Sequence, residues 1–191
     1  MFSIRRRPRT QVGFRWALAF MPKNQVASKP CRSHELDVLF ERADHAWNRG
    51  NQSAAFRLFL EAAKDGDNAA KLNVGYFYDQ GLGTQQDLAA ALYWYKKAYR
   101  SGDASAANNI GTIWRDKRNP KRALTWFRRA VRLGDHAANL EIAKHFLRTD
   151  EPRKATVYLK KVSESDQVSE SDIQEAKQLL RRAKRKRTRH S

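Results

Sequence analysis

An alanine that recurs at nearly regular spacing reveals the organisation of this 191-residue chain. The alanine stands at positions spaced by 36, 32 and 32 residues, and further apolar residues follow each copy at the same offsets. The four copies are Ala55, Ala91, Ala123 and Ala155; the residues three positions on are Leu58, Trp94, Trp126 and Tyr158, and seven positions on stand Ala62, Ala98, Ala130 and Val162. One short unit is therefore repeated. A unit of this length cannot bury its apolar face unless neighbouring copies stack on it.

The repeated unit has the pattern of a helical hairpin. Apolar residues from Leu36 to Trp47 follow the three-and-four spacing of one buried helix face, and Gly50 ends that helix. The residue before each second helix is Asn51, Asp87, Asn119 or Glu151, and the first three are good N-caps. Pro120 and Pro152 fall at the first helical position, where a missing amide hydrogen costs nothing.

The repeats are followed by a pattern typical of a terminal helix. Ser171 and Gln174 have the spacing of a capping box. An apolar stripe with polar residues opposite follows: Ile173, Ala176, Leu179, Leu180 and Ala183. The sequence thus predicts an all-α solenoid of about four helix pairs plus a C-terminal capping helix. The array spans 35–180, between a basic N-terminal extension (1–34) and a basic C-terminal tail (181–191).

The charge of the chain, +18 in total, is concentrated at its two ends. Residues 1–34 and 176–191 each carry eight Lys or Arg and no acid, which leaves only about +2 for 35–175. Seven basic residues form a candidate anion-binding tail: Arg181, Arg182, Lys184, Arg185, Lys186, Arg187 and Arg189. They could hold nucleic-acid phosphates non-specifically, or an anionic membrane surface or an acidic protein. The alternative is a solvated basic end.

The N-terminal segment leaves several interpretations open. Its apolar part is short and interrupted by Arg15, which fits a secretory signal poorly. An organellar transit peptide, an unfolded basic extension and a start codon placed too early all remain possible.

Cys31 is the single cysteine, so no intrachain disulfide can form and a reducing, cytoplasmic location is expected. No apolar run approaches the roughly 20 residues of a membrane-spanning helix.

The second unit resembles the Sel-one-like repeat, a branch of the tetratricopeptide superfamily. The residues that carry the resemblance are Ala70, Asn73-Val74-Gly75, Tyr78, Gly81-Leu82-Gly83, Gln86-Asp87, Ala91, Trp94-Tyr95, Lys97-Ala98 and Gly102. Later units lack the glycine-rich turn and are nearer to generic tetratricopeptide-like hairpins. The resemblance covers about residues 36–166. It implies a right-handed superhelix of helix pairs that holds a protein partner, whose identity it does not give.

In that superfamily a partner usually lies in the concave groove formed by the first helix of each pair. With Gly75 at the family's small first-helix position, the candidate groove residues are Leu72, Tyr76, Asp79, Gln80, Asn108, Thr112, Arg115, Asp116, Asn139, Lys144, Leu147 and Arg148. They mix both signs of charge and lack a cluster of Lys and Arg that would clamp a carboxylate. The alternative is an ordinary solvated face.

The chain shows no pattern of catalytic or cofactor-binding residues. None of the five histidines has another His or Cys at the spacing of a local metal site. Gly81-x-Gly83 is a helix connection, because Gln86 replaces the third glycine of the dinucleotide pattern and no strand precedes it. We therefore expect a non-catalytic adaptor or scaffold without a cofactor. The alternative function is an accessory protein that docks on nucleic acid or an anionic surface through its basic tails; the oligomeric state stays open.

Overall fold

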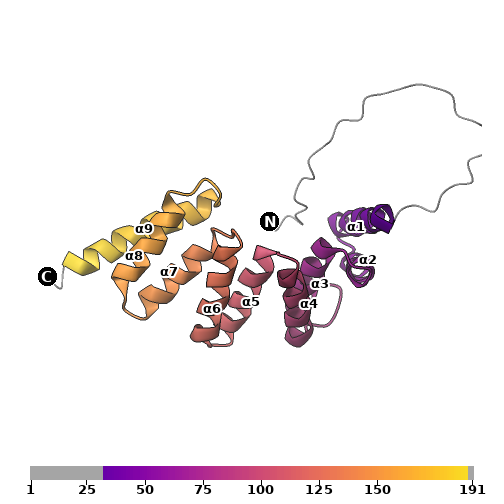
Figure 1. Cartoon of the computed structure of the whole chain (residues 1–191), viewed down its shortest axis with the longest axis horizontal. Helices are drawn as coiled ribbons and strands as arrows, with labels where there is room; N and C mark the ends of the chain where they lie inside the picture. The colour runs from indigo at the N-terminus through magenta and orange to yellow at the C-terminus, as the bar shows by residue number, and fades with distance from the viewer. Residues whose placement is uncertain (1–31, 189–191) are drawn as a thin grey trace, which may run out of the picture. The chain divides into compact units, whose positions relative to one another are not determined.

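The computed structural model describes residues 32–188. The N-terminal targeting alternatives, which concern residues 1–34, fall almost wholly outside that range. Within it the chain forms helices α1 to α9 and no strand, which confirms the predicted all-helical repeat fold (Figure 1). The helices divide into two compact units, one ending at Gln86 and the other beginning at Asp87, and each is described by itself.

The first unit holds α1 (Arg32–Asn48), α2 (Gln52–Lys64) and α3 (Asn68–Gln80). Helix α2 packs against both α1 and α3. Aromatic rings fill the space between them: the ring centroids of Phe40 and Phe59 are 5.2 Å apart, and those of Trp47 and Phe77 are 5.3 Å apart. Both pairs meet edge to face, the arrangement that aromatic quadrupoles favour.

The glycine-rich segment after α3 is a structural turn. Gly81 ends α3 in the left-handed conformation, with φ of 69°. Gly83 lies against the start of α2, where a Cβ atom would stand 2.4 Å from the backbone carbonyl atoms of Gln52. The Gln86 side chain closes the turn by donating from Nε2 to the Asp79 carbonyl oxygen at 2.7 Å. Glycine is thus required here by close packing of backbone on backbone.

The second unit is a run of six helices that pack in chain order. They are α4 (Leu88–Arg100), α5 (Ala104–Asp116), α6 (Pro120–Arg132), α7 (Ala138–Arg148), α8 (Pro152–Ser163) and α9 (Glu170–Thr188) (Figure 1). Each packs against the next, and α9 also touches α7. The α5–α6 and α7–α8 pairs are the hairpins that the 32-residue register predicts.

The predicted N-caps are confirmed. The side-chain oxygen of Asn51 accepts from the Ala54 amide at 3.1 Å, and that of Asn119 accepts from Arg122 at 3.1 Å. Asp87 accepts from two first-turn amides, and Asp103 caps α5 in the same way. Each cap satisfies amide hydrogens that the helix itself leaves unpaired, and so fixes where the helix begins.

Small residues of α5 and α7 allow close packing against the following helix. A Cβ atom on Gly111 would lie 2.6 Å from the ring of Phe127, so the α5–α6 contact needs glycine. In the next hairpin the equivalent residues are Ala143 and Leu159, which are both fully buried in one core cluster. Leu159 is smaller than Phe127, so it leaves room for Ala143 where the preceding hairpin has Gly111.

One expectation needs correction. The terminal helix begins at Glu170, so its cap is Ser169 rather than Ser171: the hydroxyl of Ser169 accepts from the Asp172 amide at 3.2 Å and donates to the Asp172 carboxylate at 2.7 Å. Of the aromatic residues three positions after the repeated alanine, Trp94 is 7% exposed, and Trp126 and Tyr158 are partly buried against the core. The predicted apolar stripe of α9 does pack: Ala176 is fully buried in the cluster with Leu159.

Candidate functional site

In the second unit the first helices α5 and α7 share one face. The guanidinium of Arg115 on α5 contacts Glu141 on α7, with Nη1 2.8 Å from Oε2. The ammonium of Lys144 on α7 contacts Glu175 on α9, with Nζ 2.9 Å from Oε1. We call the surface formed by α5, α7 and the first half of α9 the odd face. The helices that form it include the candidate groove residues Thr112, Arg115, Asp116, Lys144, Leu147 and Arg148.

Ion pairs join the charges of the odd face into one network. Glu141 stands at its centre, because its second oxygen also accepts from Lys144 at 3.3 Å. Arg115 is further held by Asp116, with Nε 2.8 Å from Oδ1. The network contains three carboxylates and two cations, so it has a slight negative excess.

The network raises the pKa of both cations. For Arg115 the hydrogen bond that it donates to Asp116 is the main cause, and Glu141 adds to it. Burial on its own would lower the pKa of Lys144, but Glu175 and Glu141 outweigh it. Both cations therefore stay charged at neutral pH and are fixed in position by neighbouring helices.

Sequence reasoning missed Glu141 and Glu175. Glu141 lies 26 residues from Arg115, and only its spacing of three from Lys144 on α7 offered a local signal. Glu175 lies on the terminal helix, for which the sequence predicts only a capping role.

Two candidate groove residues serve the interior instead. Asn139 is 2% exposed, and its amide nitrogen donates to the His136 carbonyl oxygen at 2.9 Å. Asn139 therefore does not line an open surface. The Asn108 side chain hydrogen-bonds to Asp135, the residue whose carboxylate also accepts from the Ala138 amide at 3.2 Å. Burial raises the pKa of Asp135, and the hydrogen bonds from Ala138, Ala137 and Asn108 offset part of that effect.

The remaining candidates lie on α3 and at the C-terminus. On α3, Leu72, Tyr76 and Asp79 are half-buried and Gln80 is exposed. In the basic tail, Arg181 and Arg182 are exposed on α9. The tail residues from Lys184 onward lie outside the part of the chain whose side chains are described.

The described residues contain no group of three His, Cys, Asp or Glu side chains that could hold a metal ion. None of the described helices is both long and apolar enough to cross a bilayer.

Comparison with known proteins matches the chain to two related repeat families. The model of the Sel1 repeat, the Sel-one repeat named above, matches residues 49–67, 68–103 and 164–186, and a tetratricopeptide repeat model matches 104–134. The chain is a Sel1 repeat protein. The matches confirm the predicted family, and the third one covers most of α9. Proteins of this family are generally non-catalytic and typically mediate protein–protein interactions.

Curated relatives match this Sel1 repeat protein over part of its length. DAP3-binding cell death enhancer 1 of Rattus norvegicus is 30% identical over 79 residues, which are 41% of this chain and 15% of that protein. Chitin synthase regulator SKT5 of Malassezia restricta is 38% identical over 63 residues, 33% of this chain and 4% of that protein. The chain therefore spans a small fraction of the relatives that it matches.

A solved structure supports the same fold. The protein c5321, a protective antigen of uropathogenic Escherichia coli strains that displays an SLR fold, superposes with a TM-score of 0.62 at 18% identity. The match covers 81% of this chain and 39% of that one. At this identity the likeness concerns the fold alone.

Proposed function

We propose that this Sel1 repeat protein is a non-catalytic scaffold that binds a protein partner on the odd face of its second unit. The observation that carries the proposal is the cross-helix network in which Glu141 holds Arg115 and Lys144. Charged side chains held in place by neighbours lose little conformational freedom on binding, which favours specific recognition. The relatives' names, a binding protein and a regulator, agree with this role.

The face offers a partner polar contacts. Asp116 of the network is exposed, as is Arg148 on α7, and Thr112 and Leu147 are half-buried. Mixed charge of this kind sets the orientation and choice of a partner more than the affinity. A protein segment with complementary charges of both signs fits this surface.

The test is affinity capture with the full chain as bait, at low and high salt. Thr112→Arg places a bulky cation on the odd face and should abolish capture of the specific partner. Val157→Arg on α8 adds the same charge at an exposed position outside the odd face, and it should leave capture unchanged. Thermal melts would show that both variants fold.

Two results would overturn the proposal. One is equal capture by the Thr112→Arg variant. The other is loss of all partners when Arg181 and Arg182 are replaced by Gln, which would favour docking through the basic tail.

A further inference from the structure

The charge of the second unit is segregated between its two sets of helices. Helices α4, α6 and α8 together carry 12 Lys or Arg and no Asp or Glu. Helices α5 and α7 carry three basic and two acidic residues. The near-neutral total for residues 35–175 conceals this separation, because the acids lie in other segments.

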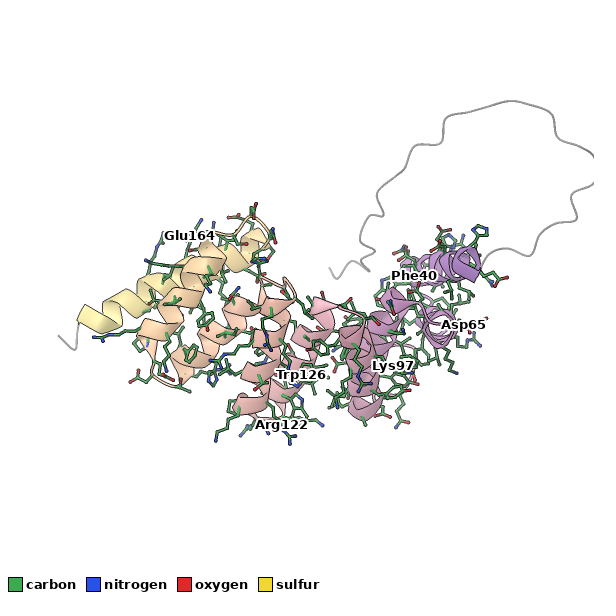
Figure 2. All side chains as sticks on the ribbon, viewed as in Figure 1. Phe40, Asp65, Lys97, Arg122, Trp126 and Glu164 are labelled. Carbon is green, nitrogen blue, oxygen red and sulfur yellow. The ribbon has the colours of Figure 1, made fainter. Side chains whose placement is uncertain are left out.

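The three basic helices lie on the side of the unit away from the odd face. Helix α5 packs between α4 and α6, and α7 packs between α6 and α8. The ring centroids of Tyr99 on α4 and Trp126 on α6 are 5.2 Å apart, which places these two helices next to each other. We call the surface of α4, α6 and α8 the even face; Figure 2 labels Lys97 on α4 and Arg122 and Trp126 on α6.

Cations and aromatic rings recur together on the even face. Lys97 Nζ lies 4.9 Å from the ring centroid of Trp94, and the Arg129 guanidinium carbon lies 4.4 Å from that of Trp126. On α8 the Lys161 ammonium stands 5.5 Å from the Tyr158 ring. In each helix the cation follows the ring by three residues. The first unit has Leu58 and Glu61 at the equivalent positions, so the pattern belongs to the second unit.

A shallow depression of about 330 Å³ on α4 adds a second element to this face. Its lining combines apolar Ala89 and Leu92 with Tyr93 and a rim of three cations, Lys96, Lys97 and Arg100. Tyr93 is 54% exposed, and Lys97 lies 4.6 Å from its ring centroid. An apolar, aromatic floor with a cationic rim suits a base and the phosphate attached to it.

We propose that the even face binds single-stranded nucleic acid, with the backbone along the cations of α6 and α8 and a base stacked on Tyr93. An acid-free field of Lys and Arg supplies phosphate binding, and the exposed ring of Tyr93 supplies stacking that is tolerant of sequence. A membrane-binding face would instead need several exposed apolar side chains to insert between lipids, and α4, α6 and α8 expose only Tyr93 and Val157 among large hydrophobics. An acidic protein would use the charge but not the aromatic depression.

The first test compares two variants with the same loss of charge in the full chain. The probe is a fluorescein-labelled oligo-uridine of about 20 nucleotides, followed by anisotropy between about 50 and 200 mM salt. Lys121→Gln with Arg128→Gln and Arg132→Gln, all exposed on α6, should weaken binding about tenfold or more and reduce the salt slope by about 2, since each contact contributes about 0.7. Lys177→Gln with Arg181→Gln and Arg182→Gln on α9 should have a much smaller effect. Equal weakening by both sets, or by the α9 set alone, overturns the proposal.

The second test separates stacking from charge. Tyr93→Leu should weaken binding of the oligo-uridine about threefold to tenfold with an unchanged salt slope, and Tyr93→Phe should bind like the parent protein. Val157→Ala is the matched control, because Val157 is equally exposed and occupies the equivalent position on α8. An unchanged affinity for Tyr93→Leu removes Tyr93 from the site and contradicts the stacking part of the proposal.

Measurements on the unmodified chain guard against variants that misfold. Bound oligo-uridine should protect Lys121 and Lys160 from acetylation, read by mass spectrometry, and leave Lys177 reactive. Binding to phosphatidylserine vesicles or to poly-glutamate without binding to the oligo-uridine overturns the proposal in favour of a membrane or an acidic protein. Protection of Lys177 alone also overturns the proposal, because it would indicate binding through the basic tail.

Discussion

Single side chains set how closely the helices of the second unit approach each other. Gly111 has the Phe127 ring where its Cβ would be, whereas Ala143 in the next hairpin faces the smaller Leu159. The two pairs consist of different residues, but the combined size of the two side chains is similar in each pair. Packing of this kind is sensitive to a single methyl group.

Gly111→Ala should therefore destabilise the protein by about 1–3 kcal/mol through overpacking. The sign is informative, because in a helix without the clash the same change would stabilise by about 1 kcal/mol. Urea unfolding followed by circular dichroism measures the effect. Adding Phe127→Leu, which reproduces the Ala143–Leu159 pair, should recover part of the loss. A stabilising Gly111→Ala would show that the two helices are not in this contact.

Asp135 links stability to pH. Because burial raises its pKa in the folded chain above the ordinary value of 3.8, its favourable contribution is complete below that value and is lost as pH rises through the raised pKa. Asp135→Asn keeps an acceptor for the Ala138 amide and removes the buried charge. We expect the variant to be more stable at pH 7 by about 1 kcal/mol or less, with the difference vanishing near pH 3. Urea unfolding at several pH values checks this. A variant that is less stable than the parent protein by the same amount at every pH would contradict it.

At the scale of elements, the turns between paired helices explain where glycine is and is not required. The residue before the N-cap of the second helix has φ of 77° at Gly50 but 53° at Arg118 and 56° at Asp150. The surrounding hydrogen bonds are the same: the amides of Gly50 and Arg118 donate to the carbonyl oxygens of Trp47 and Arg115, each at 2.9 Å. Two later turns thus hold a left-handed residue that has a Cβ atom, at a cost in strain.

Arg118→Gly should relieve that strain and stabilise the protein by up to about 1 kcal/mol, less the added freedom of glycine in the unfolded chain. Arg118→Ala is the control, because it removes the exposed side chain and retains the strain. A thermal melt in which Gly and Ala behave alike would mean that the backbone conformation at this position is not strained.

For the whole molecule, the division into two units predicts how the chain can be cut. Helices α4 to α9 contain two core clusters of their own, one around Phe127 and Phe146 and one around Leu159 and Ala176. A fragment of residues 87–191 should therefore be helical and melt cooperatively, because repeat stability sums over neighbouring contacts. A fragment with broad, non-cooperative melting would show that this unit depends on residues before Asp87.

Sequence reasoning reached features that are set by local spacing. The caps Asn51, Asp87 and Asn119 and the small residue Gly111 lie at fixed offsets within each repeat, so the register revealed them. The contact of Arg115 with Glu141 and that of Lys144 with Glu175 depend on how helices lie across one another, and no spacing encodes them.

The segregation of charge between the two sets of helices was missed in the sequence for a different reason. Summing charge over residues 35–175 averages basic second helices with acidic segments elsewhere, and the result is close to neutral. Only the assignment of each residue to a helix, and of alternate helices to opposite sides, separates the two faces.

The alternation of two unlike faces along one 32-residue period has a consequence for how such a chain can change by gene duplication. Copying a segment such as 103–134, which holds α5 and α6, would insert one odd-face helix and one even-face helix together, with five more cations on the latter. Both surfaces would lengthen in a single genetic event, and neither could be extended without the other. Substitutions can change either face on its own, whereas duplication of a repeat lengthens both faces together.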